Sequence, residues 1–153
     1  MTNTLPDLGQ PAPAFTLPTT GGKLSLESLR GKNVLLAFFP LAFTSTCTEQ
    51  LCDMRDDWDQ FASADTVVLP ISVDSTATLK AFKEKYAFKS EFVSDFRRDV
   101  SRAYGVLNDE RFYSNRAYVL IDKTGTVRWT HVEHSNGEKR ANAELLQRIA
   151  ALT

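Results

Sequence analysis

Cysteine is scarce in this chain of 153 residues, in which Cys47 and Cys52 are the only two. Two cysteines are too few for the disulfide framework of a small secreted domain. In a reducing compartment, a close pair indicates redox or metal chemistry instead. The N-terminal residues show neither the basic stretch nor the apolar stretch of a signal peptide, so we expect a cytoplasmic protein.

The sequence also has no excess of charge of one sign and no long apolar run. The 18 Lys and Arg residues against 19 Asp and Glu leave a formal net charge of -1 at pH 7. Such a balance creates no field that would gather phosphate backbones, so we predict no nucleic-acid partner. No segment approaches the roughly 20 apolar residues that span a bilayer, so we predict no membrane partner.

The remaining composition fits a compact domain. The chain is 42% apolar and 24% charged, and it has no internal repeat and no linker rich in Pro, Gly or Ser beyond its first dozen residues. A chain of this size can bury a core of its own. We therefore predict a single domain over residues 1–153.

Strand and helix patterns alternate along the chain, which predicts an α/β fold. Apolar or alternating runs predict an opening hairpin at 10–26 and strands at 33–40, 66–73, 91–95, 116–122 and 126–134. Helical spacing predicts helices at 46–63, 75–88, 97–105 and 142–151, with a short helical turn at 25–31. The turn Lys123-Thr124-Gly125 indicates an antiparallel hairpin, so the sheet is mixed. This order resembles that of a thioredoxin-like three-layer sandwich with an N-terminal extension, which is the fold we expect.

The candidate chemistry lies where the buried strand ends at Pro40 and the next helix begins near Cys47. A cysteine in the first helical turn faces unpaired backbone N–H groups and the positive end of the helix dipole, which stabilise a thiolate over a thiol. Thr44 precedes it by three residues, and taken alone it is more typical of a helix N-cap than of a catalytic group. Taken alone, Pro40 is typical of a residue that ends a strand.

Together these three residues form P-x-x-x-T-x-x-C, which resembles the active-site motif of the peroxiredoxins. The resemblance covers nearly the whole chain, from GQPAPAF to NRAYVLIDKTGTVRW. It implies that Arg116 stabilises the thiolate and the peroxide oxygens. Without the resemblance, Arg116 is typical of a surface or strand-end arginine paired with a carboxylate.

The resemblance implies a thiol peroxidase in which Cys47 attacks a hydroperoxide and becomes a sulfenic acid. The Cys47 backbone N–H, the Thr44 hydroxyl and the Arg116 guanidinium are the expected donors to the two peroxide oxygens. No metal or organic cofactor is required. The apolar neighbours Leu41, Phe43 and Phe112 suit organic peroxides.

Cys52 is the candidate resolving thiol, although a free cysteine is also a common small core residue. The spacing C-x-x-x-x-C resembles the peroxiredoxin Q subgroup, or bacterioferritin comigratory protein, which implies an internal disulfide, recycling by thioredoxin, and a chain that can act as a monomer. Other stretches, such as FFPLAFT, are similar to the one-cysteine alkyl hydroperoxide reductase E subgroup. That subgroup implies an external thiol and a homodimer.

Helix geometry limits the resolving step. Five residues along an α-helix place the Cα atoms of Cys47 and Cys52 roughly 8.6 Å apart. A disulfide tolerates at most about 7 Å between Cα atoms, so residues 48–51 must unwind before the bond can form.

A metal site, a dithiol oxidoreductase and a binding domain are the alternatives to a peroxidase. A metal site would use Cys47, Cys52, His131 and His134, but a C-x-x-x-x-C pair on one helix diverges in azimuth by about 140°, and strand positions three apart face opposite sides. A thioredoxin-like dithiol oxidoreductase would have C-x-x-C, which is missing here, and a binding domain has no need of the motif.

Overall fold

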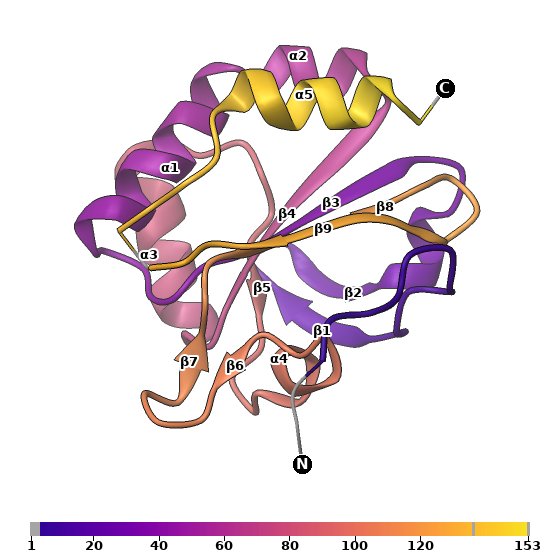
Figure 1. The fold of residues 1–153 in the computed structure, drawn as a ribbon. Helices are drawn as coiled ribbons and strands as arrows, with labels where there is room; N and C mark the ends of the chain where they lie inside the picture. Colours follow the sequence, from indigo (N-terminus) through magenta and orange to yellow (C-terminus); the bar gives the residue numbers. More distant parts are fainter. Residues whose placement is uncertain (1–3, 136, 153) are drawn as a thin grey trace.

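A seven-stranded mixed sheet with helices on its faces forms the centre of the molecule (Figure 1). This computed structural model describes residues 4–135 and 137–152; residues 1–3, 136 and 153 of the predicted domain 1–153 lie outside the described residues. The strands lie in the order β2 (Gly22–Ser25), β1 (Thr16–Thr19), β5 (Val93–Ser94), β4 (Thr66–Ser72), β3 (Asn33–Phe38), β8 (Ala117–Ile121), β9 (Val127–Val132). The predicted α/β class and the mixed sheet are confirmed.

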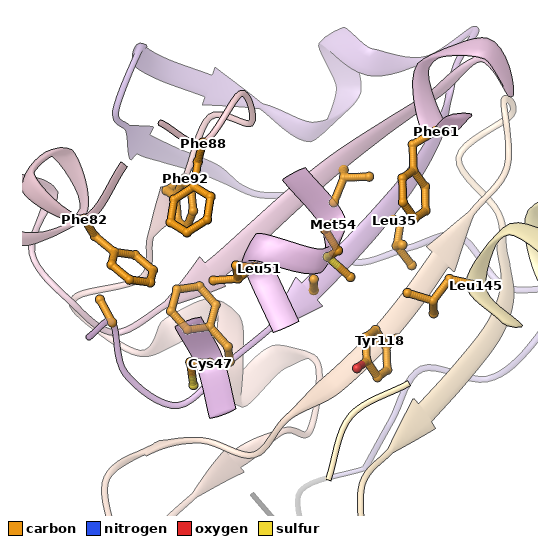
Figure 2. Close-up of a cluster of buried hydrophobic side chains, with 14 of the residues drawn as sticks. Leu35, Cys47, Leu51, Met54, Phe61, Phe82, Phe88, Phe92, Tyr118 and Leu145 are labelled. Atoms are coloured by element: carbon orange, nitrogen blue, oxygen red, sulfur yellow. The ribbon is translucent and has the colours of Figure 1, made fainter. Parts of the chain in front are cut away.

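Successive side chains of a strand point to opposite sides, so this buried sheet has two apolar faces. Helices cover both of them. They are η1 (Leu26–Leu29), α1 (Ser45–Asp56), α2 (Trp58–Ser63), α3 (Thr76–Tyr86), α4 (Asp99–Ala103) and α5 (Asn142–Ala150). Leu35 and Ala37 of β3 pack in the cluster that includes side chains of α1, α2, α3 and α5 (Figure 2). Leu36 and Phe38 pack in a second cluster with α4 and residues that precede β3. Three layers result, as predicted.

The register of the central strands decides which residues meet at the edge of the sheet. All six residues of β3 are buried, and β3 runs parallel to β4 and antiparallel to β8. Phe38 pairs with Ile71 on one side and with Ala117 on the other. The C-terminal ends of β3 and β4 and the N-terminal end of β8 therefore lie at the same edge.

The predicted helix over residues 46–63 is wrong in one respect, because Asp57 interrupts it. Asp57 separates α1 from α2 with φ -104° and ψ 18°. The side-chain amide of Asn142 donates to the Asp53 carbonyl at 2.8 Å and to the Asp57 carboxylate at 2.7 Å. The break therefore coincides with a tertiary contact between this helical segment and Asn142. Helical periodicity alone does not report such a contact.

Several smaller elements also differ from prediction. The short hairpin of β6 (Leu107–Asn108) and β7 (Tyr113–Ser114) was not predicted, and the strand predicted at 126–134 ends at Val132. The opening hairpin of β1 and β2 and the hairpin of β8 and β9 are confirmed. In the part of the chain that the structure describes, no helix has the length and apolar character needed to cross a bilayer.

The end of α3 generates a stability prediction. Ala87 lies there in the left-handed region, with φ 53° and ψ 43°, and it is exposed. Because a Cβ is disfavoured in that region, we expect Ala87→Gly to raise the free energy of unfolding by about 0.5 to 1 kcal/mol. Urea unfolding measures this. Ala81→Gly, at an exposed position inside the same helix, is the matched control and should lower stability by about 1 kcal/mol. Equal losses in the two variants would contradict the argument.

Candidate active site

Cys47 lies in the first turn of α1, as the sequence predicts. Its side chain is only 1% exposed, and it packs at the end of the apolar cluster that Leu51 and Met54 continue along the same helix (Figure 2). The first helical hydrogen bond is donated by the Thr48 amide to the Thr44 carbonyl at 2.9 Å. The Cys47 amide precedes that bond, so it belongs to the N–H groups that have no acceptor within the helix. It is available to an oxygen bound beside the sulfur.

Arg116 lies directly beside Cys47, where the resemblance places it. It immediately precedes β8, whose first residue pairs with the last residue of β3, so the sheet register carries it to the start of α1. Its Nη2 donates to the Cys47 Sγ at 3.1 Å. The Arg116 side chain is 1% exposed, so this contact is shielded from water. A guanidinium in such a place is a suitable partner for a negatively charged group.

A polar network that the sequence did not predict holds Arg116 in place. Its Nη1 donates to the Gln50 Oε1, and the Gln50 amide nitrogen donates to the Tyr118 hydroxyl at 2.7 Å. The Arg140 amide donates to the same hydroxyl at 3.0 Å. Burial raises the pKa of Tyr118 to about 12, so the hydroxyl stays protonated at neutral pH. Gln50 follows Cys47 by three residues, and that helical spacing is the signal by which it could have been found.

Thr44 and Pro40 lie in the loop between β3 and α1. Thr44 occupies the N-cap position of α1, but its side chain makes no capping hydrogen bond. Its hydroxyl instead donates to the Leu41 carbonyl at 2.7 Å. With the proton directed there, the oxygen has lone pairs left to accept a hydrogen bond. Pro40 is buried two residues after the end of β3, where it cannot add a ladder bond.

Cys52 lies on the same unbroken helix as Cys47, and both are free thiols. It is partly buried against the apolar cluster. Burial raises the pKa of the Cys52 thiol, while the charge of Arg55 lowers it by a smaller amount. The folded form thus presents Cys52 as a weak nucleophile at neutral pH.

The histidines lie in a different arrangement from that of a metal site. His131 Nε2 contacts the Glu133 carboxylate at 2.6 Å, and the other oxygen of Glu133 accepts from Arg140 Nε at 3.0 Å. His134 follows the end of β9. Across residues 4–135 and 137–152, no group of three or more His, Cys, Asp or Glu side chains is placed to hold a metal ion.

Known proteins are similar to this chain in sequence and in the arrangement of their helices and strands. The AhpC/TSA family model matches residues 8–130. The alkyl hydroperoxide reductase E of Mycobacterium tuberculosis is 38% identical over 151 residues, covering 96% of this chain and 98% of that protein. The chloroplastic peroxiredoxin Q of Suaeda salsa is 36% identical over 140 residues, covering 90% of this chain and 65% of that protein.

Solved structures agree with the sequence matches. The crystal structure of the reduced 2-Cys peroxiredoxin of Plasmodium vivax superposes with a TM-score of 0.87 at 32% identity, over 95% of each chain. The structure of AhpC from Enterococcus faecalis, at 22% identity, shares the fold with a TM-score of 0.89. The chain therefore belongs to the AhpC/TSA family, the peroxiredoxins, whose members are peroxidase oxidoreductases.

Proposed function

We propose that this peroxiredoxin reduces hydroperoxides with Cys47 as the attacking thiolate and with Thr44 and Arg116 as the groups that position the peroxide. The observation that carries the proposal is the buried contact of 3.1 Å between Arg116 Nη2 and the Cys47 Sγ at the start of α1. A buried guanidinium and a helix N-terminus both favour the thiolate, which is the nucleophilic form of cysteine.

The reaction is an in-line displacement at the terminal peroxide oxygen. A bond forms between the Cys47 sulfur and that oxygen while the O–O bond breaks, and the leaving oxygen departs as hydroxide or alkoxide and takes up a proton. Cys47 is oxidised to a sulfenic acid, and the peroxide is reduced by two electrons. The Arg116 guanidinium and the Cys47 amide supply fixed donors where negative charge develops.

Thr44 has a narrower role than the sequence predicts. Because its hydroxyl proton is directed at the Leu41 carbonyl at 2.7 Å, the oxygen serves as an acceptor for the O–H of the hydroperoxide. Accepting that bond fixes the terminal oxygen in front of the sulfur. Pro40, which is buried two residues after the end of β3, begins the same loop.

Recycling is assigned to Cys52. Its thiolate attacks the sulfenic sulfur of Cys47, hydroxide leaves and is protonated to water, and a disulfide forms. A dithiol reductant of the thioredoxin type then reduces that disulfide and is itself oxidised. Both cysteines lie in α1, so this path requires residues 48–51 to unwind. The alternative is recycling of the sulfenic acid by an external thiol, with Cys52 as a core residue.

We also propose that the enzyme works in a reducing compartment. A reducing compartment such as the cytoplasm supplies the thiols that recycle the site. Phe43, next to Thr44, is a large apolar side chain that is 46% exposed, which suits organic hydroperoxides at the site. Phe112 is 48% exposed with its ring 4.3 Å from the Arg98 guanidinium, and we assign it to the surface that a second copy of the chain would cover in a homodimer.

Cys47→Ser should lower the rate of peroxide consumption by at least about a thousandfold, because the hydroxyl that replaces the thiolate is a weak nucleophile. Stopped-flow mixing with hydrogen peroxide and with an organic hydroperoxide measures the rate. Cys52→Ser is the matched control and should still consume one equivalent of peroxide at the wild-type rate. A Cys47→Ser protein with near wild-type turnover would refute the proposed function.

The peroxide-treated protein should contain an intramolecular disulfide between Cys47 and Cys52, with faster amide exchange over residues 47–52 than in the reduced form. The reason is that the intact helix keeps the two Cα atoms too far apart for a bond. Mass spectrometry with hydrogen–deuterium exchange measures both quantities. A stable sulfenic acid on Cys47 beside an alkylatable Cys52 would assign recycling to an external thiol instead.

The thiol of Cys52 should react slowly with iodoacetamide at neutral pH in the folded Cys47→Ser variant. Since burial raises the pKa of Cys52, its thiolate forms only at a higher pH in the folded protein than in the unfolded chain. Alkylation rates measured across pH by mass spectrometry test this, with the same variant in urea as the control. Superimposable pH profiles in the two states would contradict the expected shift.

A further inference from the structure

Asp74 joins the loop that precedes α1 to the end of a neighbouring strand. It follows β4 by two residues, and its Oδ2 accepts a hydrogen bond from the Ala42 amide at 2.8 Å. The Ser72 hydroxyl donates to the same oxygen at 2.7 Å, and the Asp74 amide donates back to that hydroxyl at 3.2 Å. The carboxylate is therefore held in one orientation by its own strand while it binds the loop.

The group that Asp74 binds is directly connected to Thr44. The Ala42 N–H and the Leu41 carbonyl belong to one planar peptide unit, so a bond that fixes the N–H also fixes the direction of the carbonyl. That carbonyl accepts the Thr44 hydroxyl at 2.7 Å. The Asp74 carboxylate thus determines, through one peptide unit, where the Thr44 oxygen points its remaining lone pairs.

The loop needs such an anchor because its backbone is strained. Phe43, between Ala42 and Thr44, has φ 68°, in the left-handed region that disfavours residues with a Cβ. Its side chain is 46% exposed, although its ring lies 4.9 Å from that of Phe82. A conformation of this kind persists only where surrounding contacts impose it. The hydrogen bond from the Ala42 amide to Asp74 is such a contact, one residue before Phe43.

We propose that Asp74 is a positioning residue for peroxide reduction, which acts by orienting the peptide unit of Leu41 and Ala42 and, through it, the Thr44 hydroxyl. The inference rests on the proposed roles of Cys47 and Thr44 and adds a residue outside the P-x-x-x-T-x-x-C motif. Asp74 itself touches neither the sulfur nor the peroxide. Its effect is therefore on the placement of the substrate, while the thiolate keeps its partner Arg116.

A purely structural role is the competing explanation. The Ser94 hydroxyl donates to the Asp74 carbonyl at 2.7 Å, which ties the ends of β4 and β5 together without using the carboxylate. Ser94→Ala removes that tie and leaves the bond to Ala42 in place. It is thus a matched control for any general loosening of this edge of the sheet.

The test uses a Cys52→Ser background, in which Cys47 is the only thiol. We expect Asp74→Ala to lower the second-order rate constant for oxidation of Cys47 by hydrogen peroxide about tenfold, because a small misplacement of a reactant is costly. The ultraviolet absorbance of the thiolate at neutral pH should stay as in the parent. Asp74→Asn, whose amide oxygen can still accept from Ala42, should recover most of the rate. Ser94→Ala should react at the parent rate.

A double-mutant cycle with Thr44→Val decides whether Asp74 acts through Thr44. In the Thr44→Val protein, Asp74→Ala should slow the reaction by less than about twofold, because the group that it positions is gone. A full tenfold loss in that background, or an equal loss of thiolate absorbance, would overturn the inference. If Asp74→Ala does not fold, Asp74→Glu, which displaces the carboxylate by one methylene, should show the same loss and the same cycle.

The proposed function and this inference fail in different ways. Parent protein that does not react with peroxide would refute the peroxidase function itself. Parent protein that reacts rapidly, together with Asp74→Ala and Asp74→Glu variants that react equally fast, would refute the inference alone.

Discussion

The buried contact between Arg116 and Cys47 is the constraint on which the rest of the site depends. A guanidinium that is 1% exposed has lost nearly all of its water, and such a charge is costly unless an anion or several acceptors surround it. The Cys47 sulfur, 3.1 Å from Nη2, is a contacting group that is an anion in its thiolate form. The arginine and the proposed thiolate therefore stabilise each other, and the fold has to bring both to one point.

The register of the sheet brings these groups to one point. Because β8 runs antiparallel to β3, the residue before β8 arrives where β3 ends and α1 begins. Because β4 runs parallel to β3, the residues after β4 arrive at the same edge. Cys47, Arg116 and Asp74 are far apart in the sequence, yet three adjacent strands deliver them to one edge. Buried strands with few alternative registers make this placement reproducible.

The sequence predicts the elements of this site better than their contacts. The apolar run of β3 followed by Pro40 indicates a strand end, and Cys47 is recognisable at a helix start. Arg116 could be placed only through the resemblance of the chain to the peroxiredoxins, because sequence spacing carries no information on the register of two strands, such as β3 and β8, that no turn joins. Gln50 and Asp74 were missed for a related reason: an amide on a helix face and a carboxylate after a strand are ordinary on the surface, and only tertiary contacts give them a role. The break at Asp57 was missed because it involves Asn142, 85 residues away.

The same contact links the chemical step to the conformational step of the proposed cycle. Residues 48–51, which must unwind for a disulfide, include Gln50, whose amide group joins Arg116 to Tyr118. While Cys47 is a thiolate, its charge holds Arg116, and Arg116 in turn holds Gln50 and the first turns of α1. Conversion to the sulfenic acid removes that negative charge, so the arginine loses its ionic partner when the helix has to open. Opening of a helix end costs little where few intrahelical bonds are lost. In the proposed cycle, oxidation by peroxide therefore weakens the interaction that keeps Cys52 away from Cys47, and the proposed resolution step follows only after the first reaction.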